Sequence, residues 1–188
     1  REDTVIRSLD LARGLLVTTG LHKASTRIER YELNGKALGA LTLPGIGSAS
    51  VSVHRDRSEG FLTFTSYNEP SSIYRIDLRA DTRELWARPE VPVDPALVEV
   101  KQVSYPSKDG TQVTLFLVHK KGITLDGNNP TLLYGYGGFR IPLTPRFSAT
   151  LFPWFEAGGV YAVANLRGGG EYGDEWHKAG TLERKQNV

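Results

Sequence analysis

A chain of 188 residues, of which 39% are hydrophobic, is long enough to bury a core, which argues against intrinsic disorder. Its 23 basic and 21 acidic residues are interspersed, so a net charge of +2 gives no reason to expect nucleic acid or an anionic membrane as a partner. The chain has no cysteine, which excludes disulfide and thiolate chemistry, and no apolar run approaches the ~18 residues of a membrane-spanning helix. Because it begins at Arg1, lacks methionine and ends after a charged, helix-like run, we expect a segment of a longer protein.

Residues 1–92 have the pattern of short strands separated by turns. Runs rich in β-branched and aromatic residues nearly alternate with polar residues, and turn clusters such as Asn34-Gly35 and Pro44-Gly45 separate them. The expected strands are Val5–Leu11, Leu15–Thr19, Arg27–Leu33, Ala40–Leu43, Ser50–Val53, Phe61–Tyr67 and Ile73–Leu78. The region is therefore expected to be all-β.

An internal repeat runs through this region at a spacing of 45 residues. It aligns Leu16–Thr19 with Phe61–Phe64 and Ile28–Leu33 with Ile73–Leu78. This period suits a four-stranded propeller blade, and about two blades fit within residues 1–92. Since roughly four to eight blades close a propeller, we expect the others upstream of Arg1. The alternative is a β-sandwich in which the repeat is a coincidence.

The character of the sequence changes at Pro89–Pro95, where three prolines within seven residues can neither continue a strand ladder nor begin a long helix. We place the domain boundary here, between residues 1–92 and residues 93–188. The second part is expected to contain a helix over residues 147–157, bent at Pro153, and the strands Val98–Tyr105, Thr111–His119, Thr131–Tyr134 and Val160–Asn165. Thr131–Tyr134 is apolar on both faces, which favours a central strand.

Two glycine-rich loops follow two of these strands. The first contains Gly135-Tyr-Gly-Gly-Phe139, and the second is Arg167-Gly-Gly-Gly-Glu-Tyr-Gly173. In open α/β sheets, ligands bind at the carboxyl ends of the strands, where such loops gather. The two loops are therefore the candidate binding site.

The chemistry of the first loop has two interpretations. A dinucleotide site would need a small residue where Arg140 stands, and two nearby prolines obstruct the helix that should hold the pyrophosphate. Alternatively, backbone N–H groups and a tyrosine hydroxyl can donate to the carbonyl oxygen of an acyl substrate as that oxygen becomes negative. The second interpretation, an oxyanion hole, is favoured.

A metal site is the third possibility, because four potential ligands are close in sequence: Glu171, Asp174, Glu175 and His177. Their spacing matches no known ligand pattern, and Trp176 interrupts it. They are expected to be polar residues of a loop and a helix start, so no metal is predicted.

The run from Tyr105 to Val188 resembles the prolyl oligopeptidase family of serine peptidases. The matching motifs are Tyr105-Pro-Ser-Lys-Asp-Gly110, His119-Lys-Lys-Gly122, Leu125-Asp-Gly127, Leu133-Tyr-Gly-Tyr-Gly-Gly-Phe139, Ala164-Asn-Leu-Arg-Gly-Gly-Gly-Glu-Tyr-Gly173, Trp176-His177 and Lys185-Gln-Asn187. The run covers nearly half of the chain. The resemblance implies an α/β-hydrolase fold preceded by the last blades of a seven-bladed β-propeller.

The resemblance also implies roles for individual residues. Tyr136 corresponds to the family's oxyanion tyrosine, and Phe139 to an apolar residue that lines the pocket for the substrate proline; the alternative for Phe139 is a core aromatic beneath the loop. Residues that shape the site without a chemical step are Gly135, Gly137, Gly138 and Arg167. Tyr134 is expected to be a core residue at the strand end.

The nucleophile motif of an α/β-hydrolase, Gly-x-Ser-x-Gly, occurs nowhere in the chain. In these enzymes the triad follows the order Ser, Asp, His, so His177 is not expected to be the catalytic histidine. The triad is expected beyond Val188, and the 188 residues alone are not expected to catalyse acyl transfer.

The predicted function is that of a segment of a serine peptidase that hydrolyses short peptides on the carboxyl side of proline through an acyl-enzyme. The intact protein is expected to be a monomer that needs no cofactor and is cytoplasmic or, alternatively, periplasmic. Its partners would be short proline-containing peptides, because the propeller would exclude folded proteins. Two alternatives remain: a related oligopeptidase or an acyl- or dipeptidyl-peptidase of other specificity, and a non-catalytic propeller that serves as a binding module.

Overall fold

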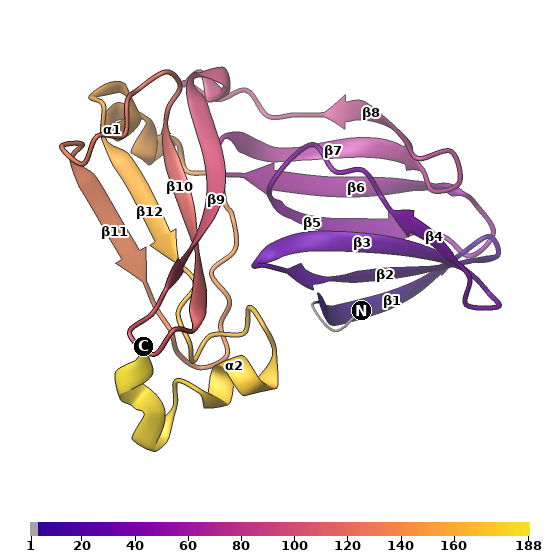
Figure 1. The fold of residues 1–188 in the computed structure, drawn as a ribbon. Coiled ribbons are helices and arrows are strands. Elements are labelled where there is room, and N and C mark those ends of the chain that lie inside the picture. The colour runs from indigo at the N-terminus through magenta and orange to yellow at the C-terminus, as the bar shows by residue number, and fades with distance from the viewer. Residues whose placement is uncertain (1–3) are drawn as a thin grey trace. The chain divides into compact units, whose positions relative to one another are not determined.

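The computed structural model describes residues 4–188, which divide into two compact units. The first unit contains the chain up to Glu90 together with Pro145–Phe147, and the second contains Val91–Thr144 and Ser148–Val188. Figure 1 shows that the first unit consists of strands, whereas the second combines a sheet with short helices. No helix within residues 4–188 is both long enough and apolar enough to cross a lipid bilayer.

The first unit is built from two antiparallel sheets, each of four strands in sequential order. The strands of the first sheet are β1 (Thr4–Ala12), β2 (Leu15–His22), β3 (Ser25–Glu32) and β4 (Ala37–Ala40). Those of the second are β5 (Ser48–Val53), β6 (Glu59–Ser66), β7 (Glu69–Asp77) and β8 (Thr82–Ala87). The repeated segments lie in the second and third strands of each sheet, as the prediction of propeller blades requires.

Three strands of this unit differ from the prediction, one of them because β7 begins at Glu69, four residues before the predicted start at Ile73. The sequence does not predict β8, because its six residues show no alternation between apolar and polar side chains. In the structure all six are exposed. The predicted strand Ala40–Leu43 lies too late, since β4 ends at Ala40. Leu41, which is buried, follows the strand and donates its backbone N–H to the carbonyl of Ile28 at 2.8 Å. Leu41 is therefore buried as part of the loop after β4 and not as part of the strand.

A single hydrophobic core joins the two sheets of the first unit. Leu15, Val17 and Ile28 from the first sheet pack in one cluster with Leu62 and Phe64 from the second. Buried and exposed residues alternate along β6 and β7, as expected for strands that cover a core with one face.

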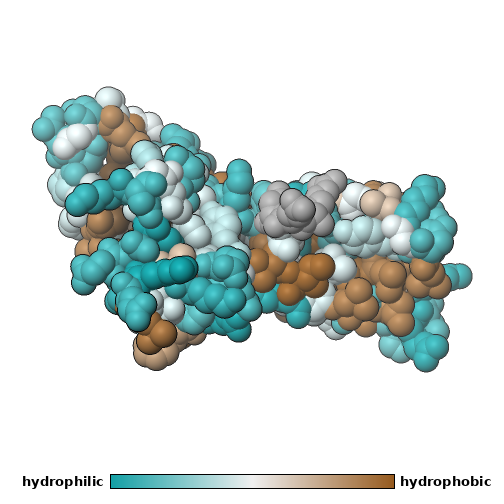
Figure 2. Space-filling view, turned by 60° about the horizontal axis from the view of Figure 1, so that its bottom comes forward, coloured by the Kyte–Doolittle hydropathy of each residue, from teal (hydrophilic) through white to brown (hydrophobic). Residues whose placement is uncertain are grey.

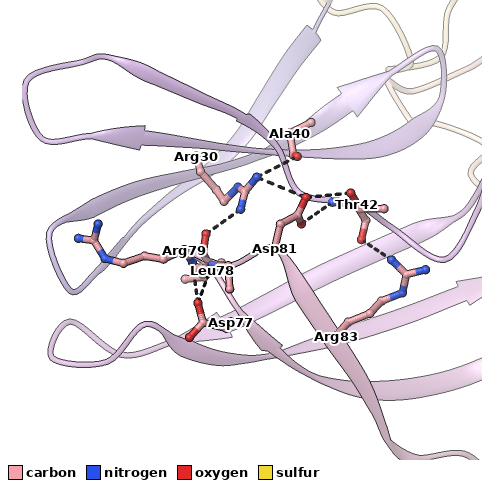
Figure 3. A network of polar contacts seen from close by, with 9 residues as sticks. Arg30, Ala40, Thr42, Asp77, Leu78, Arg79, Asp81 and Arg83 are labelled. Atoms are coloured by element: carbon pink, nitrogen blue, oxygen red, sulfur yellow. Dashed lines mark hydrogen bonds and ion pairs between the residues drawn. The ribbon is translucent and has the colours of Figure 1, made fainter.

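A buried arginine also links the two sheets (Figure 3). Arg30 on β3 is only 6% exposed and donates to the carbonyl oxygens of Leu78, at 2.8 Å, and Ala40, at 3.3 Å. Its guanidinium lies 3.5 Å from the carboxylate of Asp81, which accepts hydrogen bonds from the backbone and hydroxyl of Thr42. The charge of Arg30 is thus paired with a carboxylate and both terminal nitrogens donate hydrogen bonds, whereas its buried Nε has no hydrogen-bond partner within the described residues.

Hydrophobic side chains gather on the surface of the first unit around β1 (Figure 2). Ile6, Leu9 and Leu11 of β1 are all more than half exposed. A blade cannot bury both of its faces by itself, and stacked blades cover such surfaces.

The second unit contains a four-stranded mixed sheet in the order β11-β12-β10-β9. Its strands are β9 (Val98–Pro106), β10 (Gln112–Lys120), β11 (Thr131–Gly135) and β12 (Val160–Ala164). β10 runs antiparallel to both β9 and β12, whereas β11 and β12 are parallel. All four strands lie close to their predicted bounds.

The predicted central position of Thr131–Tyr134 is wrong for the chain described. β11 is the edge strand of the sheet, and each of its five residues is exposed. Tyr134, predicted to be a core residue, is 47% exposed. The physical reason is that β11 pairs only with β12 within residues 4–188, so its second edge and its faces lack neighbours.

The helical segments of the second unit are short. They are the 3-10 turns Pro95–Leu97, Ala149–Leu151 and Leu182–Asn187 and the helices α1 (Phe152–Glu156) and α2 (Asp174–Lys178). The helix predicted over residues 147–157 is therefore a 3-10 turn followed by five α-helical residues. Pro153 lies in the first turn of α1, where its missing N–H is tolerated, so it does not bend the helix. Phe152 and Phe155 anchor α1 as fully buried side chains.

Candidate functional site

The parallel pairing of β11 and β12 places the two glycine loops at the same edge of the sheet. Gly135, the last residue of β11, pairs with Ala164, the last residue of β12. Residues 136–144, the Tyr136 loop, and residues 165–173, the Arg167 loop, therefore leave from adjacent positions. The backbone N–H of Arg140 donates to the carbonyl of Gly168 at 3.1 Å, which joins the loops directly.

The two loops approach each other so closely that glycine is required in both. Gly137 has φ +60°, and a Cβ atom there would lie 2.8 Å from the carbonyl oxygen of Arg167. Gly168 has φ +93°, and its Cβ would lie 2.4 Å from the carbonyl oxygen of Gly137. Both the backbone conformation and the lack of space exclude a larger residue.

Tyr136 and Phe139 project from the Tyr136 loop. Their ring centroids are 6.5 Å apart with an interplanar angle of 30°. Tyr136 is 42% exposed, and its hydroxyl makes no hydrogen bond to any residue between 4 and 188. Phe139 is 83% exposed, so it is not a core residue of the described chain. Phe139 and Arg140 have φ of +49° and +60°, conformations that cost about 1–3 kcal/mol each for residues other than glycine.

An open, largely apolar pocket of about 770 Å³ lies beside Phe139. The Tyr136 loop forms one wall, and the segment after α2 forms the other, with Leu182 as an exposed apolar side chain. The lining residues are Gly138, Phe139, Arg140, His177, Gly180, Thr181, Leu182 and Lys185. The charged groups among them are basic, and no carboxylate lines the pocket.

The Arg167 side chain anchors the second loop from within. It is 5% exposed, forms an ion pair with Asp109, and donates to the hydroxyls of Ser107, at 3.0 Å, and Thr111, at 3.3 Å. Its Nε also donates to the carbonyl of Asn187 at 3.1 Å. The hydrogen bond from Arg167 is the main reason why the pKa of Asp109 falls to about 2. Arg167 thereby connects the β9–β10 turn with the last residues of the chain.

A buried polar network supports the far part of the Tyr136 loop. Asn165 donates from Nδ2 to the carbonyl of Leu143 at 2.8 Å, and Glu171 accepts the N–H of Leu143 at 2.9 Å. Thr114 on β10 lies 3.0 Å from the Asn165 side-chain oxygen and 2.7 Å from the Tyr172 hydroxyl. Burial raises the pKa of Tyr172, so the hydroxyl remains a donor.

The four carboxylate and histidine side chains weighed as metal ligands have separate partners. Glu171 serves the network above, Asp174 pairs with Arg140, and Glu175 pairs with Lys178 at 2.9 Å. His177 has its Nδ1 2.7 Å from the carbonyl oxygen of Gly168. No group of three or more His, Asp or Glu residues within the described chain could hold a metal ion.

Two residues of the site have no recognisable signal in the sequence. Asp109 lies in a predicted turn, 58 residues before its partner Arg167, and no periodic pattern pairs charges over such a distance. Lys185 lies in a charged run, yet its Nζ donates to the carbonyl of Gly137 at 2.7 Å. Only their positions within the quoted motifs set these residues apart.

Comparison with known proteins identifies relatives of both units. The family model described as the prolyl oligopeptidase N-terminal β-propeller domain matches residues 1–89, and the model of the prolyl oligopeptidase family matches residues 145–188. The prolyl endopeptidase of Elizabethkingia meningoseptica is 41% identical over 176 residues, which cover 93% of this chain and 25% of that protein. The prolyl endopeptidase of Elizabethkingia miricola is 40% identical, also over 93% of this chain and 25% of its own length.

Solved structures have the same arrangement of strands. One structure, from a study of two prolyl endopeptidases, matches with a TM-score of 0.88 and 44% identity over 100% of this chain and 28% of its own. The chain thus spans about a quarter of the length of the curated relatives that it matches.

Proposed function

Since the chain belongs to the prolyl oligopeptidase family, we propose that residues 1–92 form the last two blades of a β-propeller and residues 93–188 the first part of an α/β-hydrolase domain. The sequential order of the two four-stranded sheets supports the first assignment. The parallel pair β11–β12, with a glycine loop after each strand, supports the second.

The proposed activity of the whole protein is hydrolysis of short peptides on the carboxyl side of proline, through an acyl-enzyme. Relatives that share about 40% of the aligned residues are named prolyl endopeptidases. This chain covers a quarter of those relatives and contains no Gly-x-Ser-x-Gly motif, so the serine, aspartate and histidine of the triad would come from other parts of the protein.

Tyr136 carries the proposal, because its hydroxyl lacks a partner within residues 4–188 and stands on a loop whose backbone is tightly packed. In the proposed mechanism the serine hydroxyl loses its proton to the triad histidine as its oxygen bonds to the carbonyl carbon of the substrate proline, and the π electrons of the carbonyl move to its oxygen, which becomes negative. The Tyr136 hydroxyl then donates a hydrogen bond to that oxygen. A donor fixed in advance at this point stabilises the transition state by about 3 kcal/mol. Arg167 and the glycines Gly135, Gly137 and Gly138 shape the loops and take no chemical step.

Phe139 is proposed to bind the substrate proline. Its exposed ring faces an apolar pocket and can cover the pyrrolidine ring without any polar requirement. No carboxylate lines this pocket, so it lacks the partner that a substrate with Arg or Lys at the cleaved position would need. This observation favours proline over the basic-residue specificity known among related peptidases.

The direct test uses the full-length protein with a fluorophosphonate probe and two matched substrates, one with proline and one with arginine before the cleaved bond. We expect one probe adduct by intact mass, preferential hydrolysis after proline, and a loss of about 10²–10³-fold in kcat for Tyr136→Phe with little change in KM. Absence of any adduct in the full-length protein would leave a binding module as the remaining interpretation.

A further inference from the structure

Lys185 contacts the Tyr136 loop at the residue that directly follows the tyrosine. Its Nζ donates to the carbonyl oxygen of Gly137 at 2.7 Å, across 48 residues of sequence. The remainder of the side chain lies at the surface, and Gly137 itself is buried. The loop thus receives a charged hydrogen-bond donor at one defined peptide group, and such donors form stronger hydrogen bonds than neutral ones.

The segment that carries Lys185 is held in place by its own contacts. Lys185 lies in the 3-10 turn Leu182–Asn187. Asn187 donates from Nδ2 to the carbonyl of Ala179 at 3.0 Å, and the Asn187 carbonyl accepts from Arg167 at 3.1 Å. Lys185 therefore reaches Gly137 from a turn that is tied to the Arg167 loop rather than from a free chain.

Both residues that flank the Gly137–Gly138 peptide group lack a Cβ, so its orientation depends on packing against Gly168 and on the hydrogen bond from Lys185. In a planar trans peptide the carbonyl and the N–H point in opposite directions. A carbonyl that points at Lys185 directs the Gly138 N–H away from it. This N–H makes no hydrogen bond within the described residues, and Gly138 is only half-buried.

We infer that Lys185 is a positioning residue of the proposed peptidase: it fixes the Gly137–Gly138 peptide in one orientation and thereby orients the neighbouring Tyr136 as the oxyanion donor. The inference rests on the proposed function, because an oxyanion donor has a role only in acyl transfer. Although Lys185 also lines the pocket beside Phe139, the role proposed for it operates through its hydrogen bond to the Gly137 carbonyl. Substitution of Lys185 is expected to lower the rate of the chemical step, because a misdirected donor stabilises the transition state less while binding of the substrate is little affected.

The test compares Lys185→Met, Lys185→Arg and the control Lys178→Met in the full-length protein. Lys178 is a matched control because it is an exposed lysine on the adjacent helix whose ammonium pairs with Glu175 at 2.9 Å. We expect Lys185→Met to lower kcat about 10-fold with KM nearly unchanged, and Lys185→Arg to recover part of the loss by retaining a charged donor. Lys178→Met should match the parent.

A double-mutant cycle separates positioning from a general structural role. In a Tyr136→Phe background, Lys185→Met should cost less than about twofold, because its effect operates through the tyrosine. An equal loss in both backgrounds, or a loss confined to KM or to the melting temperature, would overturn the inference. If Lys185→Met reduces the yield of folded protein, Lys185→Gln completes the same cycle.

The proposed function and this inference fail in different ways. A parent protein that neither binds the fluorophosphonate nor cleaves after proline contradicts the proposed function. A parent that is active, and loses activity in Tyr136→Phe but not in Lys185→Met, contradicts the inference alone.

Discussion

Substitution of Gly168 by alanine tests the close approach of the two loops. The added Cβ would lie 2.4 Å from the carbonyl oxygen of Gly137, about 1 Å less than the 3.4 Å at which ordinary contact begins. Because the obstacle is backbone, it cannot turn aside as a flexible side chain would. The residue also has φ +93°, which alanine adopts only at a cost of about 1–2 kcal/mol. Overpacking adds about 1–3 kcal/mol, so the expected loss of stability is about 2–5 kcal/mol.

Alanine substitutions at two further glycines measure the conformational cost and the steric cost separately. Gly122 has φ +79° and no atom within 4 Å of the place that a Cβ would occupy, so Gly122→Ala should show only the conformational cost of about 1–2 kcal/mol. Gly180 has an ordinary φ, but its Cβ would lie 2.4 Å from the carbonyl carbon of Arg167, so Gly180→Ala should show only the steric cost. Equilibrium urea unfolding of the three variants measures each contribution.

Activity provides a second readout for Gly168→Ala. A shift of the Gly137 carbonyl by about 1 Å would displace the neighbouring tyrosine and should lower kcat about 10²-fold in the full-length protein. If Gly168→Ala were no less stable than Gly122→Ala and kept its activity, the loops would not be in contact as described.

Three other substitutions follow from the structure. The hydrogen bond from Arg167 is the main reason why the pKa of Asp109 falls from 3.8 to about 2, so the ionised form stabilises the folded state above about pH 4, and this stabilisation disappears as the pH falls towards about 2. Asp109→Asn should therefore lower the melting temperature at pH 6 and converge with the parent near pH 2. Arg30→Met should lower the free energy of unfolding, measured in urea, by about 2 kcal/mol. Arg83→Met removes an exposed member of the same network and should lower it by less than about 0.5 kcal/mol. Equal losses would show that burial of Arg30 does not matter. Phe155→Ala should cost about 3–5 kcal/mol because the side chain is fully buried, and a smaller loss would show that α1 is loosely packed.

The strands of the first unit could be predicted because their side chains alternate. In Phe61–Phe64, Leu62 and Phe64 enter the core while Phe61 and Thr63 face outwards, which produces a period of two in the sequence. β8 has no such period, since neither of its faces is buried within the described residues. A strand of this kind is defined by its hydrogen bonds to β7, and these have no counterpart in the sequence pattern.

The candidate site could be predicted only in part. The glycine loops and the exposed aromatic residues follow from composition and from the family resemblance. The exposure of Leu132 and Leu133 on the edge strand β11 could not be predicted. Their apolar side chains indicate that the strand needs to be covered, but not which element of the protein covers it. The contacts of Arg167 and Lys185 join segments 48–60 residues apart, so they depend on the tertiary fold alone.

The pairing between β11 and β12 has a consequence for the folding of the site. A slip of one residue would move Gly135 by about 3.3 Å along Ala164 and would turn every side chain of the strand to the opposite face. Such a molecule would keep its strand content and its circular dichroism spectrum, yet Gly137 would no longer meet Gly168. Only the native register of β11 and β12 brings Gly137 and Gly168 into contact. The site therefore forms only when these two strands, which a helical segment separates in the chain, are correctly aligned.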